Sequence, residues 1–163
     1  MQQYFAKNER LELEDSDYHH IKNVMRMKLG DKIKVVWNAK VYECRITGVS
    51  KNVTFEVTNT FDSKKEEVLV DVAFSLIKEQ RLNYLLQKTT ELGVNRLIPL
   101  NTKRSVVKIE KNKESSKIER WRRICKEASE QSFRCDVPKI DGVLTLQDLV
   151  CKDYDLKLLC SLD

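Results

Sequence analysis

The sequence VLVDVAF at residues 68–74 decides the fold, because it is almost continuously apolar over the length of one strand. Such a run predicts a strand buried on both faces of a parallel sheet. Residues at helical spacing follow: Leu82, Leu85, Leu86, Thr89 and Leu92. Gly93 ends this predicted helix, and RLIPL at residues 96–100 predicts the next strand. The order strand, helix, strand indicates a mostly parallel α/β sheet with right-handed crossovers.

The same alternation continues towards the C-terminus. Ser116-Lys-Ile-Glu119 has the pattern of a capping box, which predicts the start of a second helix. The residues expected on its buried face are Ile118, Trp121, Ile124 or Cys125, and Ala128. Thr145-Leu-Gln-Asp148 predicts a short capped helix, and residues 156–162 predict a further strand. A sheet that ended there would keep an open edge, so we expect a C-terminally truncated domain.

Before residue 68 the sequence has a different pattern. Asp15-Ser16-Asp17 can cap a helix, whose inner residues would be Tyr18, Ile21, Val24 and Met25. Alternating residues predict strands at 33–35, 41–46 and 53–57, with hairpins at 38–40 and 50–52. Short strands with one helix predict a small closed or half-closed β-barrel. The polar residues 59–67 are the expected boundary, which gives domains at 1–67 and 68–163.

Charge is concentrated in one segment of the chain. The net charge is +5, but residues 103–126 contain ten basic and three acidic residues. Such a cluster suits a phosphate backbone or an anionic surface, although a solvated helix face has the same composition. The five cysteines form no CxxC pair, so reduced thiols are expected rather than disulfides or a metal site. Without a signal peptide or a long apolar run, the chain is expected to be cytoplasmic, with no membrane partner.

Four segments together carry a family resemblance. They are HHIKNVMRMKLGD at residues 19–31, QKTTELGV at 87–94, TKRSVVK at 102–108, and ERW at 119–121 followed by EASEQSFR at 127–134. In this order and spacing they resemble the RsmE family of methyltransferases, which modify ring nitrogen 3 of a uridine in small-subunit (16S) ribosomal RNA. The resemblance implies a PUA-like RNA-binding β-barrel followed by a SPOUT-type α/β domain. It also implies S-adenosylmethionine as cofactor, bound in a C-terminal trefoil knot, and a homodimer at full length.

The chain departs from the family in two places. Before the helix, Ile77-Lys-Glu-Gln-Arg81 keeps two basic positions but lacks the Pro and Gly that family members usually have. The Gly-rich loop and the Leu-Arg segment that form the family's knot are missing. We therefore expect no cofactor-binding residues, no metal ligands, and no activity for these 163 residues alone.

Candidate site residues follow from position and resemblance. Arg104 follows a strand end, where it could stabilise charge on a uracil oxygen; Glu91 is the candidate proton acceptor. Gln87 and Glu91 lie at i and i+4, so a hydrogen bond that merely holds the helix is an equal alternative. The candidate RNA contacts are Lys22, Arg26, Lys78, Arg81, Lys88, Arg120, Arg122, Arg123 and Arg134. For Arg134 the alternative is bonding to the last helix carbonyls.

Two functions therefore stay open at this point. One is an S-adenosylmethionine-dependent methyltransferase of ribosomal RNA, represented here without its knot. The other is a non-catalytic RNA-binding module in which this chain is the whole gene product.

Overall fold

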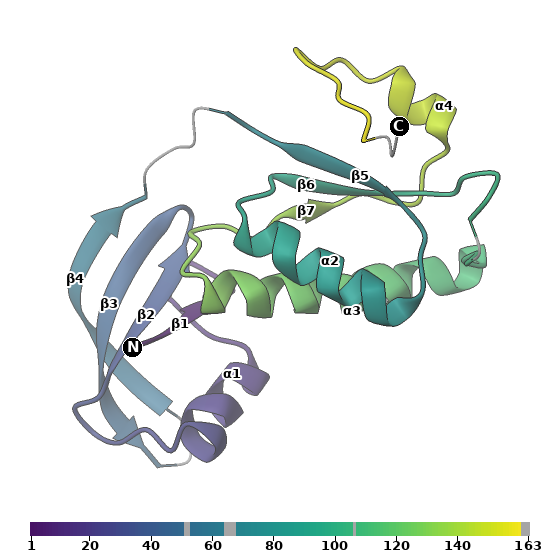
Figure 1. The fold of residues 1–163 in the computed structure, drawn as a ribbon. Helices are drawn as coiled ribbons and strands as arrows, with labels where there is room; N and C mark the ends of the chain where they lie inside the picture. The colour runs from purple at the N-terminus through teal and green to yellow at the C-terminus, as the bar shows by residue number, and fades with distance from the viewer. Residues whose placement is uncertain (51–52, 64–67, 106, 161–163) are drawn as a thin grey trace.

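The computed structural model describes residues 1–50, 53–63, 68–105 and 107–160. Its strands form two separate sheets, one of four and one of three strands. Figure 1 shows the four-stranded sheet with the N-terminal residues and the three-stranded sheet with the remainder of the chain. The domain boundary expected at residue 67 lies outside the described residues, so the division into 1–67 and 68–163 stays a prediction.

The first sheet contains β1 (Gln2–Phe5), β2 (Lys32–Trp37), β3 (Lys40–Val49) and β4 (Val53–Asp62) in that order. β1 is parallel to β2, and the other pairs are antiparallel. Asn38 and Ala39 join β2 to β3 with φ of 47° and 59°, the left-handed pair that suits a tight hairpin. Residues 51–52 of the second expected hairpin lie outside the described residues. Over the described strands the sheet does not close on itself, so the expected closed or half-closed barrel is not confirmed.

The expected N-terminal helix is shorter and irregular. Helix α1 (Asp15–His19) continues as a π-helix, η1 (His20–Val24). Ile21 is buried against the sheet, but Val24 and Met25 are exposed, so the predicted apolar stripe is only half correct. The change of helical pitch at His20 explains the error, because it rotates the later residues away from the 3.6-residue periodicity.

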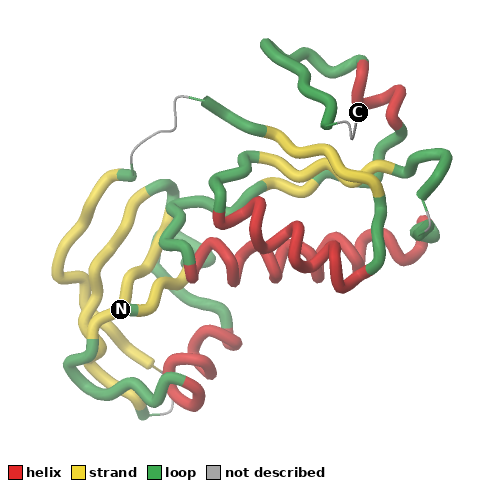
Figure 2. The backbone as a smooth tube through the Cα atoms, in the orientation of Figure 1, coloured by secondary structure: helices red, strands yellow, loops and turns green. Residues whose placement is uncertain are grey.

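The second sheet contains β5 (Asp71–Ser75), β6 (Arg96–Leu100) and β7 (Lys139–Ile140), all parallel and in that order. Helices α2 (Glu79–Glu91) and α3 (Lys111–Gln131) lie together on one face of this sheet, as Figure 2 shows in red. Their common core includes Leu86, Leu97, Trp121 and Cys125. The predicted parallel α/β layer and the buried position of Trp121 are therefore confirmed.

Several details of this layer differ from the predictions. The predicted burial of residues 68–74 on both faces is wrong: Val68, Leu69 and Val70 are exposed before the strand, and Ala73 is exposed within it. The two long helices cover only one face of this sheet, so its other face does not bury these side chains. Leu92 is 86% exposed at the C-cap of α2. Helix α3 begins five residues before Ser116, whose hydroxyl donates to the Lys113 carbonyl within the helix.

The C-terminal part agrees with one prediction and contradicts another. Helix α4 (Leu146–Val150) has the predicted capping box between Thr145 and Asp148. Residues 156–160 form no strand, and Leu156, Leu158 and Leu159 are exposed, because no strand of the described chain pairs with this segment.

Among the described residues, every helix is too short or too polar to cross a lipid bilayer. The five cysteines are free thiols. Within the same residues, no three His, Cys, Asp or Glu side chains gather in a way that would bind a metal ion.

Candidate nucleic-acid interface

The loop that carries Arg104 is anchored at the carboxyl ends of β5 and β6. The Ser75 hydroxyl at the end of β5 is 3.0 Å from the Thr102 hydroxyl and 2.9 Å from the Ser105 hydroxyl. Ser105 also accepts a hydrogen bond from the Thr102 amide at 3.0 Å. Arg104 lies between these two anchors with its side chain exposed. The guanidinium is therefore presented to solvent from a fixed loop, at the edge where open α/β sheets bind ligands.

Two further candidate RNA-binding cations lie at the N-terminus of α2, at the same edge of the sheet. Lys78 is the N-cap residue and Arg81 lies in the first turn, and both are exposed. Glu79 between them is paired with Arg120, and Lys117 Nζ lies 3.6 Å from its other oxygen. These cations of α3 lower the pKa of Glu79. Arg120 thus ties α3 to α2 and is only partly available to RNA.

Glu91 lies at the opposite end of α2 from this edge. Helix α2 runs antiparallel to β5 and β6, and its 13 residues span about 20 Å. The Glu91 carboxylate accepts hydrogen bonds from Lys88 at 2.7 Å and Gln87 at 2.9 Å. These bonds, above all that from Lys88, lower its pKa. The structure therefore does not bring Glu91 to Arg104, and it favours the helix-holding alternative for Gln87 and Glu91.

Arg134 has a structural role rather than the expected role in RNA binding. Its side chain is 9% exposed. The guanidinium donates to the Thr90 carbonyl at 2.7 Å, to the Val94 carbonyl at 2.9 Å and to the Asp136 carboxylate at 3.0 Å. Since these acceptors occupy its donors, Arg134 clamps the end of α2 to the segment after α3 and is not available to a phosphate.

Replacing Arg134 with alanine is expected to lower the free energy of unfolding by about 3 kcal/mol, because two carbonyls lose a charged donor inside the protein. Urea denaturation measures this change. Arg123→Ala is the matched control: Arg123 is exposed on α3, and we expect less than about 0.5 kcal/mol there. Equal effects of the two substitutions would contradict the clamp.

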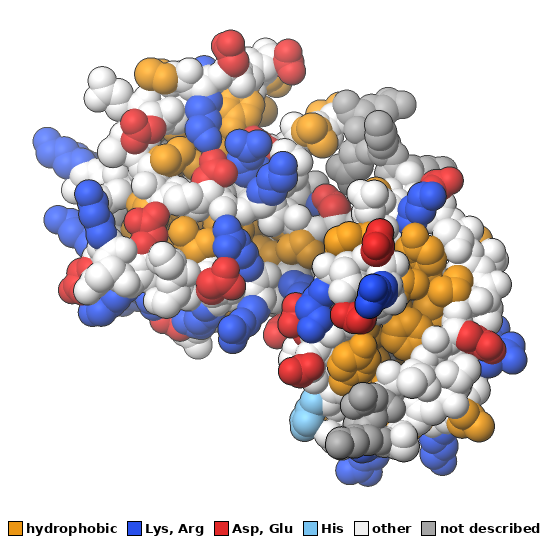
Figure 3. Space-filling view, turned by 180° about the vertical axis from the view of Figure 1, so that it is seen from behind, with side chains coloured by type: hydrophobic (Ala, Val, Ile, Leu, Met, Phe, Trp, Pro, Cys, Tyr) orange, Lys and Arg blue, Asp and Glu red, His pale blue; other side chains and the backbone are white. Residues whose placement is uncertain are grey.

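The positive charge of residues 103–126 is partly neutralised within the fold. Arg122 lies 2.8 Å from Glu119, and Lys126 is paired with acidic residues described below. Figure 3 shows Lys and Arg side chains interspersed with Asp and Glu on the face seen from behind. The basic run is thus a mixed surface rather than one continuous patch.

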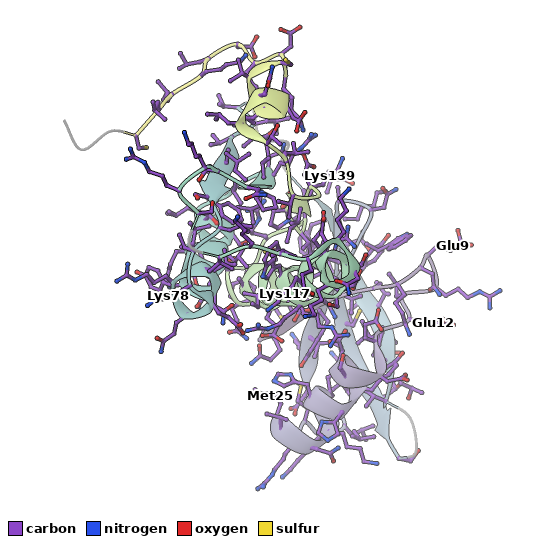
Figure 4. All side chains as sticks on the ribbon, turned by 90° about the vertical axis from the view of Figure 1, so that its right-hand side faces the viewer. Glu9, Glu12, Met25, Lys78, Lys117 and Lys139 are labelled. Carbon is purple, nitrogen blue, oxygen red and sulfur yellow. The ribbon has the colours of Figure 1, made fainter. Side chains whose placement is uncertain are left out.

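The N-terminal candidates lie apart from these residues. Lys22 projects from η1 and donates to the Ser50 carbonyl at 2.7 Å. Arg26 was expected on a helix but follows the end of η1, with a φ of 49° and an exposed side chain. Figure 4 shows Met25, next to Arg26 in the sequence, beside the N-terminal domain and away from Lys139 of the second sheet. Lys22 and Arg26 stay candidate RNA contacts of the N-terminal part of the chain.

A cleft between the two sheets contains a cluster that the sequence did not reveal. The cleft measures about 1440 Å³ and lies between the N-terminal residues and α3. Inside it, Lys126 Nζ is 2.7 Å from the Asp17 carboxylate and 3.6 Å from the Glu130 carboxylate. Glu130 also accepts from the Phe5 amide at 3.4 Å. The members come from positions up to 125 residues apart, so no local pattern could have indicated the cluster.

Burial raises the pKa of Glu130 to about 7, and nearby Asp17 contributes in the same direction. Lys126 favours the ionised form of Glu130, but it lies closer to Asp17 than to Glu130. The effect of burial on the pKa of Glu130 is therefore larger than that of Lys126. A carboxyl group with a raised pKa binds its proton more tightly in the folded protein. Its stabilising effect is complete below pH 4.5 and is lost as the pH rises to about 7.

The free energy of unfolding should therefore fall by on the order of 2 kcal/mol between pH 4.5 and 7.5 through this group. Glu130→Gln, which keeps the shape and does not titrate, should flatten the profile measured by urea denaturation. A Glu130→Gln profile that parallels the wild type would show that other groups determine the pH dependence.

Comparisons with known proteins agree with this architecture. Residues 64–163 match the family of RNA methyltransferase domains, and residues 13–57 match the family of RNA methyltransferase PUA domains. Ribosomal RNA small subunit methyltransferase E of Bacillus subtilis is 36% identical over 95% of this chain, and that of Rickettsia conorii is 29% identical over 94%. The chain spans 66% and 62% of the lengths of these two relatives.

Solved structures are similar over nearly the whole chain. A methyltransferase from Legionella pneumophila, in complex with the bound cofactor SAM, is 27% identical. It matches 97% of this chain and 69% of its own, with a TM-score of 0.82. Ribosomal RNA small subunit methyltransferase E from Neisseria gonorrhoeae, bound to S-adenosyl methionine, is 23% identical with a TM-score of 0.84. The match covers 95% of this chain and 67% of that one, and at this identity it shows the fold alone.

Proposed function

Because the chain belongs to the ribosomal RNA small-subunit methyltransferase E (RsmE) family, we propose that it grips small-subunit ribosomal RNA and presents a uridine for methylation at ring nitrogen 3. In this proposal the methyl donor is S-adenosylmethionine, which the solved Legionella relative binds. As the resemblance implies, the complete protein is a cytoplasmic homodimer with a PUA-like barrel and a SPOUT-type knot.

The observation that carries the proposal is the anchored loop at the carboxyl edge. Nitrogen 3 of uracil is a poor nucleophile until its proton leaves, and the resulting anion spreads its charge onto the two carbonyl oxygens beside that nitrogen. A cation that is already in place would stabilise that anion without reorganising during the reaction. Arg104, exposed between the Thr102 and Ser105 anchors, supplies such a cation.

We assign no cofactor site among the described residues. The cleft at α3 is lined by both acidic and basic side chains. The charged residue of the hollow beside α2 is Arg81. S-adenosylmethionine carries a sulfonium and an ammonium group, which Arg81 would repel, and a carboxylate, which Arg81 would attract. The steps assigned to this chain are therefore confined to binding RNA, orienting the uridine and stabilising the charge on uracil.

RNA binding should depend strongly on salt. We expect the logarithm of the affinity for small-subunit ribosomal RNA to fall with log salt by about 0.7 per phosphate contact. The double substitution Lys78→Glu with Arg81→Glu should reduce that slope by about 1.4, since both residues are exposed at the proposed edge. Filter binding between 50 and 300 mM salt, roughly the range over which such contacts are lost, measures it.

The comparison is the equivalent double substitution at Arg122 and Arg123 on α3. If only that substitution changes the slope, the RNA lies along α3 rather than at the carboxyl edge. If the wild type does not bind RNA at all, the proposed function is wrong.

A non-catalytic RNA-binding module is the second candidate. It is favoured by one observation: over the described ranges, the hollow beside α2 is lined by no carboxylate that could pair with the sulfonium of the methyl donor. This second candidate would be correct if the protein binds RNA but deletion of its gene leaves uridine methylation unchanged.

A further inference from the structure

The outward face of α2 carries an aromatic side chain that packing does not explain. Leu82, Leu86 and Thr90 are buried beneath the helix, whereas Tyr84 projects from the other side and is 64% exposed. Most large aromatic side chains bury the greater part of their area, so an exposed ring on a helix indicates a surface for contacts.

The neighbours of this ring are cationic and polar. Tyr84 lines a hollow of about 520 Å³ together with Ile77, Gln80, Arg81 and Leu85. Arg81 precedes the ring by three residues, so both side chains lie on one face of the helix. One turn further on, Lys88 Nζ lies 6.0 Å from the centre of the ring. The hollow therefore contains a guanidinium and an amide together with the ring, and an ammonium that is paired with Glu91 lies one turn further along the helix.

In the described part of the chain, the acidic residues of α2 leave Lys78 and Arg81 without an acidic partner, whereas Glu91 pairs with Lys88 at 2.7 Å. Glu79 is held by Arg120 and Lys117 of α3, and Glu91 by Gln87 and Lys88. Among the ion pairs of the described residues, none involves Lys78 or Arg81. Figure 4 shows Lys78 on the opposite side of the molecule from Glu9 and Glu12, so this face points away from those acids.

The hollow begins two residues along the chain from the strand end that anchors the Arg104 loop. Ile77, which lines the hollow, lies two residues after Ser75. The Ser75 hydroxyl contacts both anchors of the Arg104 loop, at 3.0 and 2.9 Å. A strand of RNA whose uridine lies at Arg104 would therefore bring a neighbouring nucleotide to Tyr84.

We propose that Tyr84 stacks against an unpaired base of the RNA next to the target uridine, with Arg81 contacting a flanking phosphate. This inference rests on the proposed function and adds a second base-binding position to it. An aromatic ring stacks on any base, while a flanking phosphate requires a cation such as Arg81. Gln80 in the same hollow can hydrogen-bond to a base edge and would give the position some preference among bases.

The test uses a single-stranded oligoribonucleotide from the region around the methylated uridine, with 2-aminopurine placed next to that uridine. Stacking quenches its fluorescence, and titration with the full chain gives the affinity. Tyr84→Phe, which keeps the ring, should bind within about twofold of the wild type, whereas Tyr84→Ala should bind about tenfold more weakly and lose the quenching. The matched control is Leu92→Ala, an exposed apolar residue at the other end of α2.

The outcomes separate this inference from the proposed function. If the wild type does not bind the RNA, the proposed function fails. If it binds and Tyr84→Ala binds and quenches equally well, only the stacking position is wrong. If sedimentation shows that Tyr84→Ala changes the oligomeric state and not RNA binding, the ring contacts a second copy and the inference is overturned. Because the Tyr84 ring is exposed, replacing it with alanine removes little packing, and alanine favours the helix. We therefore expect the variant to fold, and circular dichroism verifies this.

Discussion

Replacing Arg104 with alanine is expected to slow methylation of the target uridine by about 100-fold or more, roughly the effect of removing one oriented charge-stabilising donor from an active site. The reason is the fixed position of the loop: Ser75, Thr102 and Ser105 hold it through hydrogen bonds of 2.9 to 3.0 Å. A guanidinium that is already in place stabilises the uracil anion at no cost in reorganisation. Arg104→Lys keeps the charge but not the planar fork, so an intermediate rate is expected.

The measurement is the initial rate of methyl transfer to small-subunit ribosomal RNA. The enzyme is the product of the natural gene, purified from the cells that carry it. Lys103→Ala is the control, because Lys103 is the exposed neighbour in the same turn. A rate unchanged by Arg104→Ala would remove Arg104 from the reaction. A loss of RNA affinity with an unchanged maximal rate would make it a phosphate contact instead.

Replacing Lys126 with methionine should lower the free energy of unfolding by about 3 kcal/mol at neutral pH. The Asp17 side chain is 10% exposed and depends on Lys126, 2.7 Å away, for its counter-charge. Methionine keeps the packing of the aliphatic stem but leaves that carboxylate uncompensated. Since the pair joins α1 to α3, its loss should also loosen the N-terminal sheet from the α/β layer.

A double-mutant cycle with Asp17→Asn tests the origin of the effect. If the ion pair is responsible, the double variant should be clearly more stable than the sum of the single changes predicts. Lys139→Met, at an exposed residue lining the same cleft, should have little effect. Additive changes at Asp17 and Lys126 would mean that the two side chains do not depend on each other.

The sequence predicted those features that depend on neighbouring residues. Strand β6 has the predicted limits, the capping box at Thr145 forms, and Trp121 is buried, because each follows from a pattern within a few residues. The pitch change at His20 and the early start of α3 escaped prediction, since neither has a strong local signal. The parallel pairing of β1 with β2 joins residues about 30 positions apart, which periodicity cannot show.

The candidate site was predictable in part. Arg104 could be placed because it follows β6 directly, and Lys78 and Arg81 because they begin α2. Glu91 lies at the other end of the layer because a crossover helix runs antiparallel to the strands that it joins. This position could therefore have been predicted from the order of strand and helix in the sequence. The clamp at Arg134 and the cluster of Asp17, Lys126 and Glu130 depend on tertiary contacts alone.

If the proposed function is right, this chain presents a uridine of small-subunit ribosomal RNA for methylation at nitrogen 3. Mass spectrometry of nucleosides from that RNA, in cells with and without the gene, tests it most directly. We expect 3-methyluridine to be present with the gene, to be absent when the gene is deleted, and to return with the wild-type gene but not with Arg104→Ala. An equal amount of 3-methyluridine in the RNA of both strains would contradict it.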